Sequence, residues 1–291
     1  MSLEALYDVP APAKLNLFLH VVGRRADGYH LLQSVFALID WSDTLHFELR
    51  RDGNLARHDL GTTLPADDLC LRAARLLQLH SGSALGTDIS IDKRLPSGAG
   101  LGGGSSDAAS TLLALNRLWR LNWPRTRLLA LAAKLGADVP FFVGGDNAFV
   151  EGIGERLTPL VLGPQSYAVL KPAAGIATAD IFASPRLKRD TPAVILAGFL
   201  ASAGQAGRFV SGYGRNDLQP IAEAVCPEVR AVARWLEARF GNSRMSGSGS
   251  AVFARVGAEE RSTWQAGEVP AGWVGRMCRS LEQHPLKGWS S

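Results

Sequence analysis

The segment LPSGAGLGGGSSDAAS, Leu95 to Ser110, joins a run of glycines to helix-forming sequence. Five of the seven residues from Gly98 to Gly104 are glycine, each costing roughly 0.5–1 kcal/mol relative to alanine inside a regular element. Glycines let a backbone approach an anion closely, and a helix N-terminus presents unpaired N–H groups and the positive end of its dipole. The hydroxyls of Ser105 and Ser106 add donors, or a ligand for a nucleotide-bound Mg²⁺. We therefore interpret the segment as a phosphate-binding loop.

Other interpretations of this segment fit less well. A flexible Gly/Ser linker has little use between a predicted strand and a predicted helix of one domain. Residues Gly98 to Gly103 satisfy GxGxxG, but a dinucleotide site also needs an acidic residue about 20 positions later. Residues Arg117 to Arg127 contain no acid. The GK[ST] of a Walker A loop and the HRD and DFG of protein kinases are also missing from the sequence.

Lys14, Asn16 and Asp138 could act on a bound phosphate and its acceptor. Residues 12–21 alternate apolar and less apolar side chains, which predicts a half-buried strand with Lys14 and Asn16 on one face. Asp138, in LGADVPFF, could accept or orient the proton of an acceptor hydroxyl. Lys14 as a solvated strand lysine and Asp138 as a turn residue remain the alternatives.

Three aromatic or imidazole rings could stack on a base. Tyr29 and His30 follow an Asp27-Gly28 turn signal, and Phe182 lies within TADIFASP. Taken singly, each is equally consistent with ordinary loop surface. The residues alone thus indicate an anion-binding protein, and a nucleotide-dependent transferase is the function they favour.

The surrounding pattern predicts the elements that position these residues. Expected strands cover residues 12–21, 31–39, 43–49, 87–95, 166–172 and 251–256, and expected helices cover residues 68–79, 105–119, 125–135, 193–203 and 228–240. Ser105 or Ser106 should cap the helix after the glycines, with Asp107 in its first turn, and Gly136 should follow the helix over 125–135. Strands and helices mix without regular βαβ alternation, which favours an α+β fold with a domain junction near residue 160.

Composition limits the class of protein. The 291 residues are 46% hydrophobic and 20% charged, with a net charge of +4, as expected for a globular protein that binds anionic ligands. Three isolated cysteines, Cys70, Cys226 and Cys278, predict reduced thiols and no zinc site. No apolar run reaches the ~20 residues of a membrane span, and the first residues lack a secretory pattern. We expect a cytoplasmic protein that binds neither nucleic acid nor a membrane, and we infer no obligate protein partner.

Four segments resemble the GHMP kinases, the superfamily of galactokinase, homoserine kinase and mevalonate kinase. In chain order these are AKLNLFLHVVGRRADGYHLLQSVF, PSGAGLGGGSSDAAS, LGADVPFFVGGDNAFVEGIGE and MSGSGSAVFA. GRRADGYH and GADVPFF are similar to the branch acting on 4-diphosphocytidyl-2-C-methyl-D-erythritol. The resemblance covers nearly the whole chain. It implies ATP-dependent phosphorylation of the 2-hydroxyl of that substrate in non-mevalonate isoprenoid precursor biosynthesis.

The resemblance also implies a fold and a set of site residues. The fold is a two-domain α+β GHMP kinase fold, with an ATP-binding domain like part of a ribosomal protein over residues 1–160 and a ferredoxin-like domain over residues 161–291. Lys14 and Asp138 match the catalytic pair, and Mg²⁺ would be carried with the nucleotide. The positions that match the ATP site are Lys93, Pro96, Ser97, Gly98, Ala99, Gly100, Leu101, Gly102, Gly103, Gly104, Ser105 and Ser106. Those that match the substrate side are Asn16, Tyr29, His30, Thr178 and Phe182, with the rings of Tyr29 and Phe182 enclosing cytosine.

The sequence departs from the family pattern at one position, and two alternative functions remain. Relatives usually carry asparagine where this chain has Asp68, a position associated with the adenine pocket, and aspartate keeps only the acceptor. A homoserine or mevalonate kinase would explain the glycine loop but not GRRADGYH. An RNA-binding module could use a basic patch of Arg117, Arg120, Arg125 and Arg127, although that spacing is also typical of a solvated face.

Overall fold

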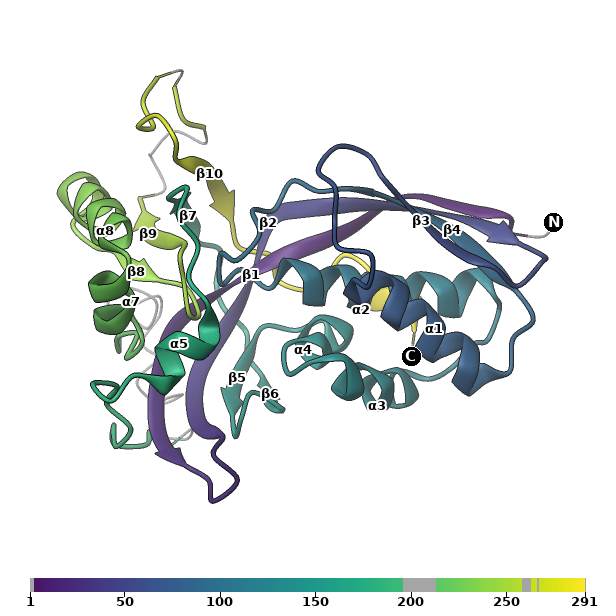
Figure 1. Ribbon diagram of the computed structural model, residues 1–291, viewed down its shortest axis with the longest axis horizontal. Helices are drawn as coiled ribbons and strands as arrows, with labels where there is room; N and C mark the ends of the chain where they lie inside the picture. The colour runs from purple at the N-terminus through teal and green to yellow at the C-terminus, as the bar shows by residue number, and fades with distance from the viewer. Residues whose placement is uncertain (1–2, 196–212, 258–262, 266, 291) are drawn as a thin grey trace.

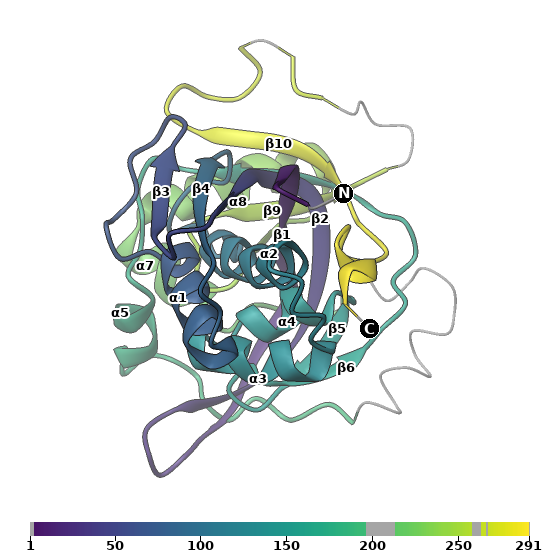
Figure 2. The ribbon, with the colours of Figure 1, turned by 90° about the vertical axis from the view of Figure 1, so that its right-hand side faces the viewer.

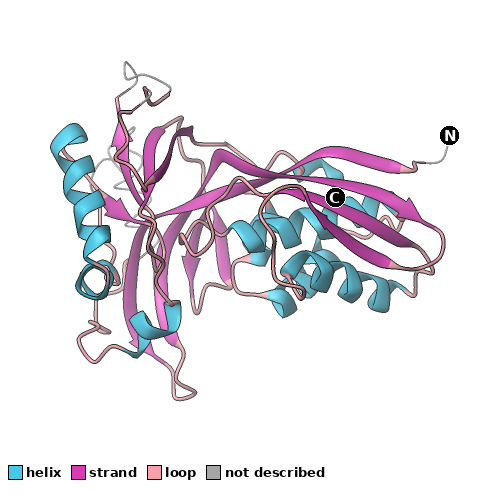
Figure 3. Cartoon of the chain, turned by 45° about the horizontal axis from the view of Figure 1, so that its top comes forward, coloured by secondary structure: helices cyan, strands magenta, loops and turns pink. Residues whose placement is uncertain are grey.

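The strands form two sheets, each with helices on one face (Figures 1 and 3). The computed structural model describes residues 3–195, 213–257, 263–265 and 267–290. The larger sheet contains β1 (Ala5–Arg24), β2 (His30–Arg50), β3 (Leu55–Asp59), β4 (Gly86–Asp92), β5 (Ala148–Glu151) and β6 (Arg156–Pro159). Its order is β3-β4-β2-β5-β6, with β1 paired to β2. The mixed helix and strand content agrees with the predicted α+β class.

The hairpin of β1 and β2 runs the length of the molecule and supports both halves (Figure 1). The runs predicted over 31–39 and 43–49 form one strand, because pairing with β1 continues through Ser42 and Trp41 is buried. The prediction that the strand over residues 12–21 is half-buried was wrong. Residues 11–21 are buried on both faces, since hydrophobic clusters lie on either side of the strand and a register shift after Asn16 breaks the alternation.

Four helices cover one face of the larger sheet: α1 (Leu69–Ser81), α2 (Gly103–Leu118), α3 (Arg125–Leu135) and α4 (Val139–Gly144). Asp68 caps α1 by accepting the Leu71 N–H at 3.0 Å. The predicted cap of α2, Ser105 or Ser106, was wrong by three or four residues, because the helix is capped by Gly102 and begins at Gly103. The two serines therefore lie inside its first turn and Asp107 lies beyond it. Gly136 follows α3 in extended backbone rather than in the left-handed region.

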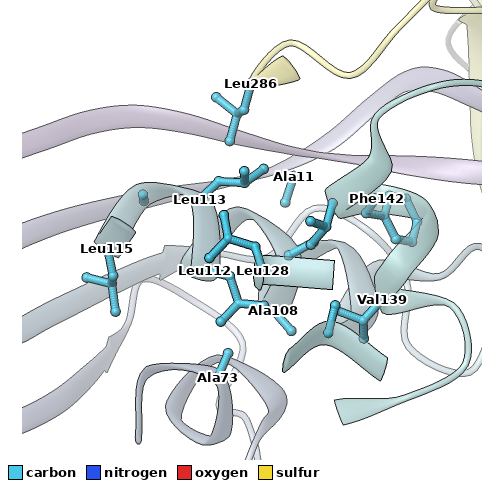
Figure 4. Close-up of a cluster of buried hydrophobic side chains, with 14 of the residues drawn as sticks. Ala11, Ala73, Ala108, Leu112, Leu113, Leu115, Leu128, Val139, Phe142 and Leu286 are labelled. Atoms are coloured by element: carbon cyan, nitrogen blue, oxygen red, sulfur yellow. The ribbon is translucent and has the colours of Figure 1, made fainter. Parts of the chain in front are cut away.

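The core between these helices and the sheet is built mainly on α2 (Figure 4). Leu112, Leu113 and Leu115 of α2 are fully buried, in the same cluster as Val139 of α4. Leu286, from the last residues of the chain, enters this cluster from the other side of α2. The C-terminal segment is thus part of the first half of the fold.

The smaller sheet has the order β10-β7-β9-β8, built from β7 (Ser166–Lys171), β8 (Arg244–Met245), β9 (Val252–Val256) and β10 (Val274–Arg279). It is accompanied by α5 (Thr178–Ala183), α7 (Gln219–Val225) and α8 (Pro227–Phe240). Apolar residues of α8 pack on β7 and β9, and a second cluster joins this sheet to β1 and β2. Of the helix predicted over 193–203, residues 196–203 lie outside the described part of the chain.

After β10 the chain returns to the larger sheet. Leu281 N–H donates to the Leu38 carbonyl at 2.9 Å, and the 3₁₀ helix η2 (Lys287–Trp289) lies beside α2 (Figure 2). β6 ends at Pro159 and β7 begins at Ser166, around the domain junction predicted near residue 160, which stays a prediction. In the described ranges, no helix combines the length and apolarity that a membrane crossing requires.

Candidate active site

The glycine segment forms a loop between β4 and α2 whose conformation requires glycine at two positions. Gly100 has φ +71°, and a Cβ there would overlap the carbonyl oxygen of Ser246. Gly102 has φ +73°, and a Cβ would lie 2.9 Å from the Phe142 ring and 3.2 Å from Lys14 Cγ. The glycines therefore let the loop pack directly against the second half of the molecule and against Lys14.

The loop and the start of α2 line a pocket of about 390 Å³. No side chain caps α2, so its first amides keep their N–H groups available at the positive end of the helix dipole. Ser105 lines this pocket, whereas Ser106 is buried and its hydroxyl donates to the Pro12 carbonyl at 2.7 Å. Only one of the two predicted serine donors is thus positioned for a ligand. The pocket can hold an anion such as a phosphate chain.

Lys14, Asn16 and Asp138 come together beside this loop. Lys14 is 3% exposed, and its ammonium donates to Asn16 Oδ1 and lies 3.6 Å from Asp138 Oδ2. Asn16 is fixed in turn because its Nδ2 donates to the Ser34 hydroxyl at 3.0 Å. Burial lowers the pKa of the Lys14 ammonium, and the Asp138 carboxylate opposes that shift. The side chain of Asp138 is 31% exposed, so a solute can reach the carboxylate.

Asp138 immediately precedes α4, and the opposite end of this short helix is held by the C-terminal segment. Arg125 of α3 donates to the Val143 carbonyl at that end and to the Ser290 carbonyl, the latter at 2.8 Å. α4 is therefore tied at one end to the tail and presents Asp138 at the other.

Lys93 lines the same pocket, but its ammonium is already paired. It contacts the carboxylate of Asp43 and lies 2.7 Å from Asp107 Oδ2. Asp43 also accepts the N–H groups of Arg94 and Leu95, at 2.6 and 2.7 Å. Burial raises the pKa of Asp107, Lys93 opposes that shift, and Asp43 adds to it. Lys93 thus anchors the loop entrance through buried carboxylates.

A second Gly/Ser loop, residues 245–251, packs against the phosphate loop and supports it. We call this second loop the brace. Ser246 Oγ accepts the Asn16 N–H at 3.1 Å and donates to the Gly100 carbonyl at 3.0 Å, which links β1 to the loop. Asn216 holds this brace by donating to the carbonyls of Met245 and Gly247, each at 2.7 Å. The brace fixes the spacing between the phosphate loop and Asn16.

The predicted substrate residues fall into two groups: Asn16 lies beside Lys14, and the other four lie in α5 or at the tip of the β1–β2 hairpin. The rings of His30 and Phe182 are 4.9 Å apart and inclined by 33°, and the Thr178 hydroxyl is 2.6 Å from the Ser248 hydroxyl. Tyr29 lies at the tip of the β1–β2 hairpin and is 60% exposed. The enclosure of cytosine by Tyr29 and Phe182 stays a prediction.

Asp68 uses its carboxylate within the protein. Besides capping α1, it lies 3.1 Å from the Arg57 guanidinium, and it lines the 390 Å³ pocket. An asparagine could cap the helix but could not form this ion pair. Asp68 therefore has an ion-pair partner, Arg57, that an asparagine at this position would lack.

The arginines proposed as an RNA-binding patch are largely used for packing. Arg117 lies over the Trp289 ring at 5.1 Å, and Arg127 lies over the Trp123 ring at 3.4 Å. Arg125 holds the C-terminal segment, as described above. These contacts favour the structural interpretation of the arginine spacing.

Sequence reasoning missed several residues of the site. Asp43 begins what looked like a separate strand, and Asn216 lies in a segment without any motif, so nothing local marked either residue. Ser246 lies within the MSGSGSAVFA segment, whose Gly/Ser content was a usable signal.

Comparisons with known proteins identify the family of the chain. Residues 68–146 match the family model described as the GHMP kinases N terminal domain, and residues 197–263 match GHMP kinases C terminal. A 4-diphosphocytidyl-2-C-methyl-D-erythritol kinase of Methylibium petroleiphilum is 65% identical over 293 residues, covering 100% of both chains. One of Polaromonas naphthalenivorans is 55% identical, covering 99% of this chain and 97% of its own.

Two solved structures are also similar. A crystal structure of 4-(cytidine 5'-diphospho)-2C-methyl-D-erythritol kinase has a TM-score of 0.73 and 37% identity, covering 86% of this chain and 89% of its own. A homoserine kinase from Cytophaga hutchinsonii has a TM-score of 0.67 at 16% identity, covering 97% and 96%. The second likeness concerns the fold alone.

Proposed function

The chain belongs to the GHMP kinase family, and we infer that it transfers the γ-phosphoryl group of ATP to 4-diphosphocytidyl-2-C-methyl-D-erythritol. It is accordingly a phosphotransferase with an alcohol acceptor. The relative with 65% identity along the full length carries the substrate assignment. The placement of Lys14 and Asp138 beside the phosphate loop carries the mechanism.

ATP would place its phosphates in the pocket at the start of α2. The free amides of the first turn, the Ser105 hydroxyl and the backbone of Gly98 to Gly102 supply donors and close approach. Lys93 would contribute indirectly, because its ammonium is engaged by Asp43 and Asp107. In this proposal it holds the loop in place through these two ion pairs.

The acceptor hydroxyl would approach between Asp138 and the γ-phosphate. As its oxygen forms a bond to γ-phosphorus, the bond to the β,γ-bridging oxygen breaks and ADP leaves. The hydroxyl proton passes to the Asp138 carboxylate, which is exposed enough to receive it. The Lys14 ammonium, held by Asn16, faces the negative charge of the transferring group.

The chain's own residues fit a Mg²⁺ ion carried by the nucleotide. Among the described residues, no group of three acidic, histidine or cysteine side chains could bind a metal unaided. Asp107, however, lines the pocket, and its Oδ1 is buried without a hydrogen-bond partner in the described structure. Asp107 and Ser105 would therefore supply the protein's oxygen ligands. When bound, the ion would neutralise part of the phosphate charge.

On the substrate side, Asn16, Tyr29, His30, Thr178 and Phe182 would receive the cytidyl substrate. The contact between the rings of His30 and Phe182 supports this, because it joins the start of β2 to α5 near the tip of the β1–β2 hairpin. Tyr29 would close over the base from that tip. The reacting group would then be the 2-hydroxyl of the methylerythritol.

The regiochemistry can be tested on the product. The chain is incubated with ATP and 4-diphosphocytidyl-2-C-methyl-D-erythritol, and the product is examined by ³¹P NMR with carbon correlation. A new phosphomonoester coupled to C2 supports the proposal. A phosphate on another hydroxyl, or on the cytidine ribose, would overturn the placement of the substrate relative to Asp138.

A further inference from the structure

The guanidinium of Arg189 is fixed by hydrogen bonds in which it is always the donor. Its terminal nitrogens donate to the carbonyls of Leu187 at 3.0 Å, Phe182 at 3.0 Å and Ser184 at 2.9 Å. Its Nε donates to His30 Nε2 at 2.9 Å. Because the three carbonyls hold the group in place, Arg189 cannot turn its N–H away from His30.

This contact decides where His30 carries its proton. A guanidinium has only donors and stays charged, so the ring nitrogen facing it must accept with its lone pair. A neutral imidazole has one N–H, which must therefore be on Nδ1. In the described residues, no protein group forms a hydrogen bond to that nitrogen. His30 is thus left with one oriented, unused donor.

The surrounding charges keep the ring neutral. Burial lowers the pKa of His30 first, and the guanidinium groups of Arg189 and Arg24 lower it further. Arg24 pairs with His30 across the β1–β2 hairpin and donates to the Gly28 carbonyl at 3.1 Å. No carboxylate contributes to the shift. A second proton on the ring would place an N–H against an N–H and a cation against two cations.

The same arginine joins the two walls of the proposed cytidyl site. It binds the carbonyl of Phe182 at the end of α5, and the Phe182 ring lies 4.9 Å from the His30 ring. In Figure 1, α5 crosses the lower part of β1 and β2, where His30 begins β2. The position of the His30 ring and its protonation are therefore both set by Arg189.

We propose that Arg189 determines base specificity by holding His30 as a fixed Nδ1–H donor toward the ring acceptors of cytosine. Cytosine N3 is an acceptor, whereas uracil carries N3–H and would oppose that donor. A fixed donor thus favours a cytidine ester and penalises its uridine analogue, because two donors would face each other unpaired. The specificity part rests on the proposed function, whereas the protonation state of His30 does not.

The protonation state can be tested on the unliganded protein. Long-range ¹H–¹⁵N correlation spectra of ¹⁵N-histidine-labelled protein distinguish the two imidazole tautomers, and a His30→Asn sample assigns the signals. We expect only the Nδ1–H form in the wild-type protein and in Arg189→Lys, which keeps a donor-only cation. Arg189→Gln, whose amide can also accept, should give a mixture. An Nε2–H ring in the wild-type protein would overturn the proposal.

Kinetics separate the specificity role from simple anchoring of α5. Arg189→Gln should raise KM for the cytidyl substrate and lower the cytidyl-to-uridyl ratio of kcat/KM by about tenfold, while KM for ATP stays unchanged. Arg189→Lys should restore the ratio although it loses some carbonyl bonds. The exposed neighbour Arg186, changed to Gln, is the matched control and should behave like the wild-type protein.

Each outcome bears on a separate claim. An unchanged ratio in Arg189→Gln would overturn the specificity role, and a ratio that Lys fails to restore would reduce Arg189 to an anchor of α5. If the wild-type protein does not phosphorylate the cytidyl substrate at all, the proposed function fails. The tautomer spectrum would then still decide the protonation of His30.

Discussion

The carboxylate of Asp138 lies 3.6 Å from the buried ammonium of Lys14, whose side chain packs beside Gly102 of the phosphate loop. Lys14 is inside the longest pair of strands, whereas Asp138 precedes a helix held from behind by the C-terminal segment. Their alignment therefore depends on a rigid scaffold. Phosphoryl transfer is accelerated mainly by such positioning.

Asp138→Asn should remove the proton acceptor while keeping the shape of the site. We expect kcat to fall by about 10²–10⁴-fold, with ATP affinity and thermal stability nearly unchanged. Steady-state kinetics, ATP titration and thermal melting measure the three quantities. The exposed Asp67, changed to Asn, is the control. Wild-type rates in Asp138→Asn would remove Asp138 from the mechanism.

Tyr29→Ala should affect the cytidyl substrate much more than ATP. A ring stacked on a base contributes about 1–3 kcal/mol, so KM for the substrate should rise at least several-fold. Since Tyr29 is 60% exposed, its removal should leave the melting temperature unchanged. Equal effects on both substrates would show that this ring does not stack on cytosine.

Gly102→Ala and Gly98→Ala form a matched pair in the phosphate loop. Both residues have positive φ, so each substitution carries a backbone cost of about 1–2 kcal/mol. Only at Gly102 would the added Cβ collide, with Phe142 and Lys14. Gly102→Ala should therefore lower the free energy of unfolding by about 1–3 kcal/mol more and reduce kcat. Equal destabilisation in urea titrations would contradict the close packing at Gly102.

His284, in the C-terminal segment, predicts a dependence of stability on pH. It is 1% exposed, accepts the Leu286 N–H at 3.1 Å, and burial together with Arg125 lowers its pKa to about 3. Between about pH 6.5 and pH 3 the unfolded chain therefore binds the extra proton, so this contribution to stability falls as the pH falls. The slope should approach about 1.4 kcal/mol per pH unit.

Urea unfolding of the wild-type protein and of His284→Gln at pH 6 and pH 4 measures this contribution. The substituted protein should lose much of the slope, whereas the exposed His80, changed to Gln, should keep it. An unchanged slope in His284→Gln would show that the buried imidazole does not govern acid sensitivity.

The parts of the site that the sequence predicted are those with local signals. The phosphate loop is marked by glycines, Lys14 and Asn16 by strand alternation, and the helix over 125–135 by its apolar spacing. Two predictions were wrong because distant segments contact these elements: the half-buried strand over residues 12–21 and the serine cap of the helix after the glycines. β1 is buried on both faces, and α2 follows Gly102 directly instead of a serine cap.

The contacts that the sequence did not reveal join distant segments through side chains. Asp43 reaches Lys93 from the middle of β2, Asn216 holds the brace below the phosphate loop, and Arg189 reaches His30. Each is an ordinary polar residue without a periodic or capping pattern around it. Their roles follow from tertiary packing, which a single sequence does not specify.

The most direct test measures Mg²⁺-dependent release of ADP from ATP with three separate acceptors: 4-diphosphocytidyl-2-C-methyl-D-erythritol, homoserine and mevalonate. The account predicts turnover with the cytidyl substrate alone, and its loss in Asp138→Asn. Turnover with another acceptor only would keep the phosphotransferase class and contradict the substrate. No turnover with any acceptor by the folded protein would contradict the proposed function as a whole.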